Sequence, residues 1–146
     1  MIDAAIEVKA QFYDLDPMQV VWHGNYARFL EQARCELLDR IGFNYEEMVS
    51  SEWAWPIVEM RTKYVRPIRF GQRIRCIAAL RDYENRLRID YRIEDVTSGE
   101  VLTTAQTTQL AVHRHSGETL LESPACLVEA VQRALRASGA MGAVGR

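Results

Sequence analysis

The residues of this chain best suited to chemistry lie in one segment, YDLDPMQVVWHGNY, residues 13–26. Aspartate side chains are ionised at neutral pH, so Asp16 can attack an electrophilic carbonyl carbon or take a proton from water. His23 follows in the same segment and can orient water or donate a proton. Asp14, two residues before Asp16, is better suited to capping a turn or supporting the site by a hydrogen bond. The segment therefore predicts hydrolysis of an activated carbonyl group.

A long helix is expected to begin where this segment ends. Apolar residues recur at three- and four-residue steps and mark one helical face, at Tyr26, Phe29, Leu30, Ala33, Leu37 and Ile41. Asn25 or Gly24 suits the start of this helix, and Gly42 suits its end. Free N–H groups around His23 and Gly24 carry partial positive charge and can receive a carbonyl oxygen that gains negative charge. Gly24 also allows a ligand to approach the backbone closely.

The same segment resembles the signature of 4-hydroxybenzoyl-CoA thioesterases and related short-chain acyl-CoA thioesterases. That signature has an aspartate before a proline or small residue, an apolar pair, an aromatic residue or histidine, and Asn-Tyr opening the long helix. The matching positions here are Asp16, Pro17, Val20, Val21, Trp22, Asn25 and Tyr26. Further similarity reaches to about residue 125 and includes Val58, Tyr64, Pro67 and Gly71. Two positions depart from the family: Gln19, where many relatives carry glycine, and Gln72, where an aspartate is frequent.

This resemblance implies an acyl-CoA thioesterase with a specific set of site residues. Asp16 would be the nucleophile or general base, and the backbone at His23 and Gly24 would polarise the thioester carbonyl. The imidazole of His23 would orient water or protonate the leaving thiolate, a role that we rank below that of Asp16. The substrate would contact Trp22, Gly24, Asn25, Tyr26, Arg86 and Arg88, with Arg66, Arg69 and Arg73 as further basic candidates. The family implies a homodimer or homotetramer without a metal or cofactor.

The elements that must position this segment can be read from the rest of the chain. Alternating residues predict strands over 5–13, 57–65, 73–83, 87–94 and 100–113, linked mainly by tight turns. A short helical segment over 45–50 and an amphipathic helix over 124–136 complete the pattern. We therefore expect an α+β fold in which an antiparallel sheet of about five strands wraps around one long helix, and the family resemblance implies that this is the hot-dog fold. A single domain should cover 1–136, with a loose tail over 137–146.

Composition excludes several classes of function. The formal net charge of -2 argues against a nucleic-acid partner, which needs a clustered positive surface. No stretch approaches the ~20 apolar residues of a membrane span, and no secretion signal precedes the first strand. Cys35, Cys76 and Cys126 are too few and too widely spaced for a disulfide framework or a metal site, so a cytoplasmic location is expected. His113 and His115 lack further metal ligands nearby.

Three alternatives to an acyl-CoA thioesterase remain open. An acyl-carrier-protein thioesterase would share the chemistry but bind a protein partner. A hot-dog hydratase would place its histidine about five positions after the aspartate in an Asp-x-Asn-Pro-x-His pattern, which this segment does not follow. A non-catalytic module that binds acyl-CoA would have no need of Asp16. The absence of a GxSxG motif argues against an α/β-hydrolase type of thioesterase.

Overall fold

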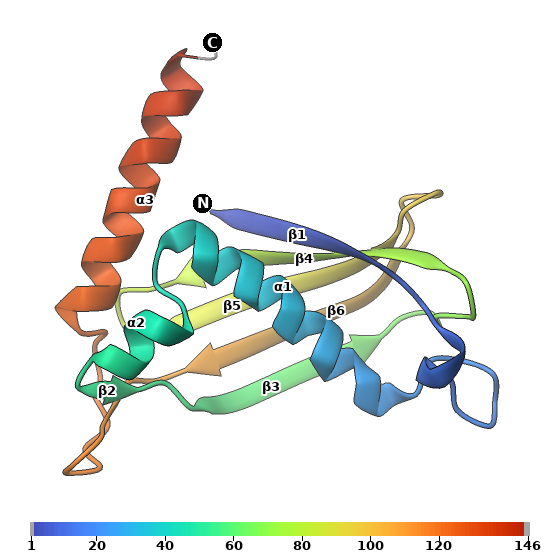
Figure 1. Ribbon diagram of the computed structural model, residues 1–146, viewed down its shortest axis with the longest axis horizontal. Coiled ribbons are helices and arrows are strands. Elements are labelled where there is room, and N and C mark those ends of the chain that lie inside the picture. The colour runs from blue at the N-terminus through green and yellow to red at the C-terminus, as the bar shows by residue number, and fades with distance from the viewer. Residues whose placement is uncertain (1, 145–146) are drawn as a thin grey trace.

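The computed structural model describes residues 2–144 and contains a curved antiparallel sheet around one long helix (Figure 1). The sheet strands are β1 (Asp3–Lys9), β3 (Ile57–Tyr64), β4 (Arg73–Asp82), β5 (Leu87–Asp95) and β6 (Val101–Gln109). The helices are α1 (Tyr26–Ile41), α2 (Tyr45–Ser50) and α3 (Ala125–Val144). A separate two-stranded ribbon pairs β2 (Trp53–Ala54) with β7 (Val112–His113). The predicted α+β class, with about five strands around one helix, is confirmed.

The strand order is β1-β4-β5-β6-β3, and every neighbouring pair is antiparallel. The register defines two ends of the sheet. Lys9 pairs with Arg73 at the end that also carries Tyr64, which we call the loop end because residues 10–25 leave β1 there. The other end carries the turn between β4 and β5, and we call it the hairpin end. These two ends decide which predicted site residues can meet within one chain.

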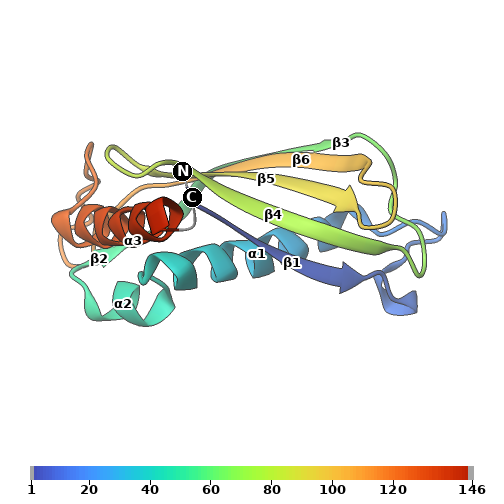
Figure 2. The same ribbon diagram turned by 90° about the horizontal axis from the view of Figure 1, so that it is seen from above.

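The core lies between α1 and the concave face of the sheet (Figure 2). Phe29, Leu30 and Leu37 of α1 are fully buried there. On β5 the alternation is regular, because its inward residues are buried and the residues between them are partly or fully exposed. The apolar residues that predicted α1 therefore form the face that packs on the sheet. Gly42 ends the helix in the left-handed conformation, at φ 81°.

Two of the predicted strands differ from those observed. The strand predicted over 5–13 ends at Lys9, because Phe12–Asp14 forms a single turn of 3-10 helix. The backbone N–H of Gln11 donates to the side chain of Asp14 at 2.8 Å, and this local bond replaces a ladder bond. The strand predicted over 100–113 is divided, because β7 leaves the main sheet to pair with β2.

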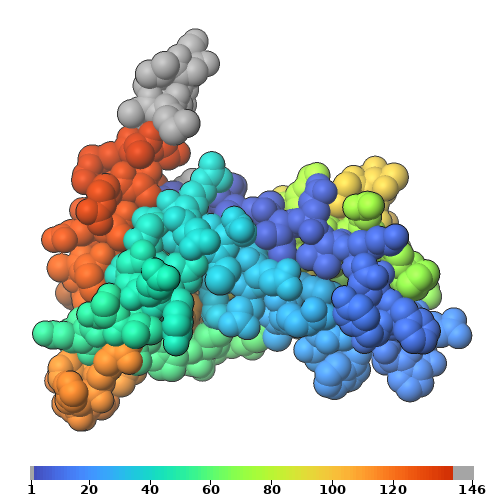
Figure 3. Space-filling view, in the orientation of Figure 1, coloured from blue at the N-terminus to red at the C-terminus, as the bar shows by residue number. Residues whose placement is uncertain are grey.

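The C-terminal helix is longer than predicted. We expected it over 124–136, whereas α3 continues to Val144 and extends away from the sheet at the hairpin end (Figure 1). Its buried residues are Leu127, Ala130 and Val131. The domain boundary at 136 and the flexibility expected for 137–146 stay predictions. Figure 3 shows α3 and the segment that precedes α1 at opposite ends of the molecule.

Candidate active site

The carboxylate of Asp16 lies in a tight turn over residues 16–20. Its Oδ1 accepts a hydrogen bond from the N–H of Met18 at 2.8 Å and a longer one from Val20 at 3.5 Å. The backbone closes the same turn, since the N–H of Asp16 donates to the carbonyl of Val20 at 2.9 Å. Across residues 2–144, no hydrogen bond reaches Oδ2. One oxygen of the carboxylate is thus held in place, and the other accepts no hydrogen bond from the residues that the structure describes.

The turn contains a strained residue, Gln19, whose φ is 65°. Within residues 2–144 no other residue except glycine has a positive φ. This conformation costs a non-glycine residue about 1–2 kcal/mol, which explains why glycine suits the same position in the resembling family. The side chain of Gln19 is exposed and therefore does not fill the interior. A glutamine in place of the family's glycine thus costs conformational energy at this position.

Asp14 is buried, with only 2 % of its surface exposed. Its hydrogen bonds join the 3-10 turn that it ends to the start of α1. Its Oδ1 accepts from Nη2 of Arg28 at 2.5 Å, and its Oδ2 accepts from the N–H of Gln11 at 2.8 Å. Its backbone carbonyl accepts from the N–H of Trp22 and from Nδ2 of Asn25, each at 2.9 Å. The supporting role predicted for Asp14 fits these contacts, because it joins the turn of Asp16 to the start of α1.

The helix begins with a 3-10 turn over His23–Asn25 that continues into α1 without a break. The N–H groups of His23 and Gly24 make no hydrogen bond to residues 2–144, as expected for the first donors of a helix. A Cβ on Gly24 would lie 2.4 Å from the indole of Trp22, so the ring occupies the space that we predicted for a ligand. Asn25 does not cap the helix with its side chain, which binds Asp14 instead.

Comparisons with known proteins identify the fold and family. The profile of the thioesterase-like superfamily matches residues 10–135. The chain belongs to this superfamily. A Synechocystis protein with a provisional esterase name is 30% identical over 125 residues, covering 85% of this chain and 75% of the relative. The fold recurs in a DHNA-CoA thioesterase from Staphylococcus aureus, with TM-score 0.79, 23% identity and coverage of 100% and 97% of the two chains.

A third similar structure is an aspartate-to-asparagine mutant of 4-hydroxybenzoyl CoA thioesterase complexed with 4-hydroxybenzoyl CoA. Its TM-score is 0.75 and its identity 17%, with 88% of this chain and 98% of that chain covered. The predicted hot-dog fold, the predicted thioesterase family and the predicted class of enzyme, a thioester hydrolase, are confirmed by the superfamily match and these likenesses.

In this thioesterase, Tyr26 and Tyr64 connect the helix start to the sheet. Burial raises the pKa of Tyr26, and the nearby Tyr64 and the negative charge of Asp16 raise it further. The rings of Tyr26 and Tyr64 meet edge to face, with centroids 4.8 Å apart. The hydroxyl of Tyr64 donates to the carbonyl of His23 at 3.4 Å. The helix start and the loop end of β3 therefore lie together.

The predicted arginines lie elsewhere in the single chain. Arg86 and Arg88 are at the hairpin end, where Arg86 pairs with Asp82 at 3.5 Å. β4 separates them from the loop end by its ten residues, or roughly 30 Å at 3.3 Å per residue. One protomer therefore does not bring Arg86 or Arg88 to its own Asp16.

Three basic candidates, Arg66, Arg69 and Arg73, lie at the loop end, and Arg69 is the one whose backbone pairs with the segment of Asp16. Its backbone forms a bridge with Val20, and the N–H of Val21 donates to the carbonyl of Ile68 at 2.7 Å. Gln72 holds this connection in place, because its Oε1 accepts from the N–H of Arg69 at 3.0 Å. Its Nε2 donates to Asp95 at 2.7 Å and is the main cause that lowers the pKa of that carboxyl group.

The remaining titratable candidates give no second site. Within the described part of the chain, no cluster of three or more His, Cys, Asp or Glu side chains could hold a metal ion. The rings of His113 and His115 are 5.8 Å apart at the end of β7. A hollow of about 570 Å³ lies on the outer face of the sheet beside Arg61 and Lys63, away from α1. We assign no role to it.

Proposed function

We propose that this protein is an acyl-CoA thioesterase that uses Asp16 to hydrolyse the thioester and releases the free acid and coenzyme A. The observation that carries this proposal is the free Oδ2 of Asp16 in a turn that leads, through the hydrogen bonds of the Asp14 carbonyl to Trp22 and Asn25, to a helix start whose N–H groups at His23 and Gly24 are unbonded. A carboxylate and two donors on one carbonyl are the minimum that thioester hydrolysis requires. The names of the similar structures, which include two CoA thioesterases, support the choice of coenzyme A.

The reaction can proceed by either of two balanced routes. As a general base, Asp16 takes a proton from water, the water oxygen bonds to the carbonyl carbon, and the C–S bond breaks to release the thiolate. As a nucleophile, Asp16 bonds to the same carbon and expels the thiolate, and water then hydrolyses the resulting anhydride. In both routes the N–H groups of His23 and Gly24 hold the negative oxygen. A single turnover in ¹⁸O-water labels Asp16 only in the second route.

We further propose that two copies pair along β3. This strand is one of the two edges of the sheet, the other being β1, and it exposes Ile57, Val58, Met60 and Tyr64. An exposed apolar edge strand is a template for pairing with another chain. A two-fold axis would pair the strands antiparallel and set the hairpin end of one protomer beside the loop end of the other. The partner's Arg86 and Arg88 would then approach Asp16, as the family resemblance implies.

Coenzyme A is the carrier that this arrangement favours. Its phosphates need cations at the mouth of the site, and Arg69 together with Arg86 and Arg88 from the second copy would supply them. The three cysteines are free thiols, which supports action in the reducing cytoplasm. Among residues 2–144, no helix is both long and apolar enough to cross a membrane.

The deciding experiment compares carriers for the same acyl group. Octanoyl-CoA, octanoyl-acyl-carrier protein and octanoyl-N-acetylcysteamine are offered to the wild type, and thiol release is followed. We expect the highest kcat/KM with the CoA ester, and a lower value with N-acetylcysteamine because phosphate contacts are lost. Faster release from the carrier protein would favour the alternative acyl-carrier-protein thioesterase. Tight binding of octanoyl-CoA without thiol release would indicate a binding module.

A further inference from the structure

Three exposed aromatic side chains lie near one another at the loop end. Phe12 and Tyr13 have 80% and 76% of their surfaces exposed, and Phe70 has 63%. The N–H of Gly71 donates to the carbonyl of Ala10 at 2.9 Å, so the turn that carries Phe70 lies beside the turn that follows β1. We call the three rings the aromatic cluster. Exposed apolar clusters on a folded protein mark a surface that meets a partner or a membrane.

Hydrogen-bonded turns hold the aromatic cluster outward. Phe70 lies in a turn over residues 69–72, which a backbone hydrogen bond of 3.1 Å closes and in which Gly71 has a φ of 79°. The other two rings belong to the 3-10 turn Phe12–Asp14, in which Asp14 is buried. The fold itself therefore exposes the three rings.

Two basic side chains without a carboxylate partner adjoin the aromatic cluster. Lys9 and Arg73 lie directly opposite each other on β1 and β4, where like charges destabilise a sheet. Two positions earlier on the same strands, Arg75 pairs with Glu7 at 3.0 Å. Within residues 2–144, neither Lys9 nor Arg73 forms such an ion pair. We call these two cations the basic pair.

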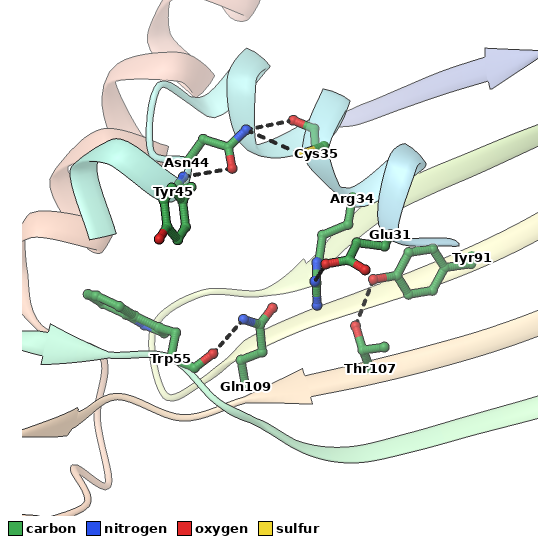
Figure 4. Close-up of polar contacts among 9 residues, drawn as sticks. All are labelled: Glu31, Arg34, Cys35, Asn44, Tyr45, Trp55, Tyr91, Thr107 and Gln109. Atoms are coloured by element: carbon green, nitrogen blue, oxygen red, sulfur yellow. Dashed lines mark hydrogen bonds and ion pairs between the residues drawn. The ribbon is translucent and has the colours of Figure 1, made fainter. Parts of the chain in front are cut away.

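Polar side chains in the interior find their partners within the chain. Between α1 and the sheet, Arg34 donates to Glu31 at 3.1 Å, and the hydroxyl oxygens of Tyr91 and Thr107 are 2.8 Å apart (Figure 4). The basic pair has no comparable partner among the described residues. An anion from outside the chain would relieve the repulsion between its two charges.

The charge of the chain is distributed unevenly between its two ends. Exposed glutamates gather at the hairpin end, on α2, in the turn between β4 and β5, and in the segment after β7: Glu46, Glu47, Glu84, Glu118 and Glu122. The basic pair lies at the loop end. A negatively charged surface would therefore repel the hairpin end and attract the loop end, although the net charge of the chain is -2.

We propose that the aromatic cluster and the basic pair dock this protein on an anionic lipid bilayer. The rings enter the interface between lipid headgroups and chains, and the cations contact lipid phosphates. An acidic protein would also match the cations. Rings that protrude separately from two turns suit a fluid bilayer better than a protein, which must supply a pocket for each ring. Docking of this kind needs no membrane-spanning helix.

The docking surface is compatible with the proposed pairing along β3. The aromatic cluster and the basic pair lie beside β1 and β4, and β1 is the edge of the sheet opposite β3. The turn of Phe70 also connects to the catalytic segment, because Arg69 forms a backbone bridge with Val20. Docking therefore places the turn of Asp16 near the lipid surface. The inference goes beyond the proposed function, because a vesicle can be bound without hydrolysis of a thioester.

The test measures co-flotation of the whole chain with lipid vesicles. The vesicles contain phosphatidylcholine alone or phosphatidylcholine with about 30% phosphatidylglycerol. We expect the protein to bind the anionic vesicles at least ten-fold more tightly than the neutral ones. Most of this binding should be lost in about 0.5 M NaCl, because salt screens the contacts between the cations and the phosphates.

Lys9→Glu tests the basic pair and includes its own check on folding. Binding to anionic vesicles should weaken about ten-fold or more, because one charge of the pair is reversed. The new carboxylate would face Arg73 across the strands, so the melting temperature should stay the same or rise. Arg133→Glu makes the same change of charge at an exposed position of α3 and should bind like the wild type. Equal losses in both variants would show that binding follows net charge, and would overturn the inference.

The double variant Phe12→Ser/Phe70→Ser tests the aromatic cluster. Vesicle binding should weaken at least ten-fold, because two rings no longer enter the interface, while turnover of octanoyl-CoA in solution stays unchanged. Tyr45→Ser/Leu121→Ser is the matched control, since it removes two similarly exposed apolar side chains at the hairpin end, and it should bind like the wild type. In addition, anionic vesicles should shift the added emission of Phe70→Trp, but not that of Leu121→Trp, to shorter wavelengths.

The outcomes separate this inference from the proposed function. No binding to either vesicle, or binding that both loop-end variants retain, would overturn the docking and leave the thioesterase intact. Vesicle binding that both variants lose, in a protein that hydrolyses no thioester, would retain the docking and remove the proposed function. Binding of acyl-carrier protein that both variants lose, without binding to vesicles, would assign the surface to an acidic protein and overturn the inference.

Discussion

Nη2 of Arg28, on the first turns of α1, donates to the buried Oδ1 of Asp14 at 2.5 Å. Asp14 also accepts from Gln11, so it fixes the helix to the turn of Asp16. Asp14→Ala should lower the free energy of unfolding by about 2–3 kcal/mol, because it leaves the N–H of Gln11 unpaired and removes the partner of Arg28. Urea denaturation measures this. Glu7→Ala, which removes an ion pair between two exposed side chains, Glu7 and Arg75, should cost under about 1 kcal/mol.

Asp16→Asn should abolish most turnover and leave stability unchanged, in contrast to Asp14→Ala. The amide oxygen can still accept from Met18, so thermal melting should hardly change. Loss of the charge should lower kcat about 100-fold or more. His23→Ala should cost less than Asp16→Asn, since the backbone N–H at position 23 remains. Steady-state rates on one acyl-CoA ester decide the ranking, and near-normal turnover by Asp16→Asn would remove the assigned role.

The proposed pairing along β3 predicts that a charge on the edge strand separates the protomers. Val58→Lys should reduce the mass in solution from that of a dimer, twice 16.8 kDa, to that of a monomer, 16.8 kDa. The reason is that a lysine on an edge strand opposes pairing. Leu121→Lys, a change at a similarly exposed apolar residue outside β3, should leave the mass unchanged. Light scattering gives both masses. The separated Val58→Lys variant should also show a raised KM for acyl-CoA, and a monomeric wild type would contradict the pairing.

Cys76 makes stability depend on alkaline pH. The residue is fully buried on β4, and burial raises the pKa of its thiol from 9.0 to about 12. Below pH 9 the thiol is protonated whether the chain is folded or unfolded, so it gives no pH dependence. Between pH 9 and pH 12 only the unfolded chain loses the proton, and stability falls. At pH 10.5 the loss should be about 2 kcal/mol.

Cys76→Ala should flatten this slope, although it lowers stability at every pH by removing buried volume. Urea denaturation of both proteins at pH 8 and pH 10.5 gives the comparison. Cys35 is exposed on α1, so Cys35→Ala should retain the alkaline slope of the wild type. Equal slopes in the wild type and Cys76→Ala would show that the thiol does not titrate differently on folding.

The period of the apolar residues determined most of the secondary structure. Tyr26 to Ile41 repeats at helical steps, and Leu87 to Ile93 alternates, because each element must bury one face against the other. The catalytic candidates were equally accessible to sequence reasoning. Asp16, His23 and Gly24 lie within nine residues, so the sequence alone shows that they belong to one segment that ends at the start of a helix.

Only the tertiary structure decided which distant residues meet. Arg86 and Arg88 matched the family but lie at the hairpin end, since antiparallel pairing places the two ends of β4 far apart. Tyr91 and Thr107 gave no signal in the sequence, because alternation shows that a residue faces inward but not that two hydroxyl groups on neighbouring strands meet. Register and the packing of α1 create that contact, and they depend on the whole chain. The sequence by itself thus determined the local chemistry, while the contacts between distant residues depended on the assembled sheet.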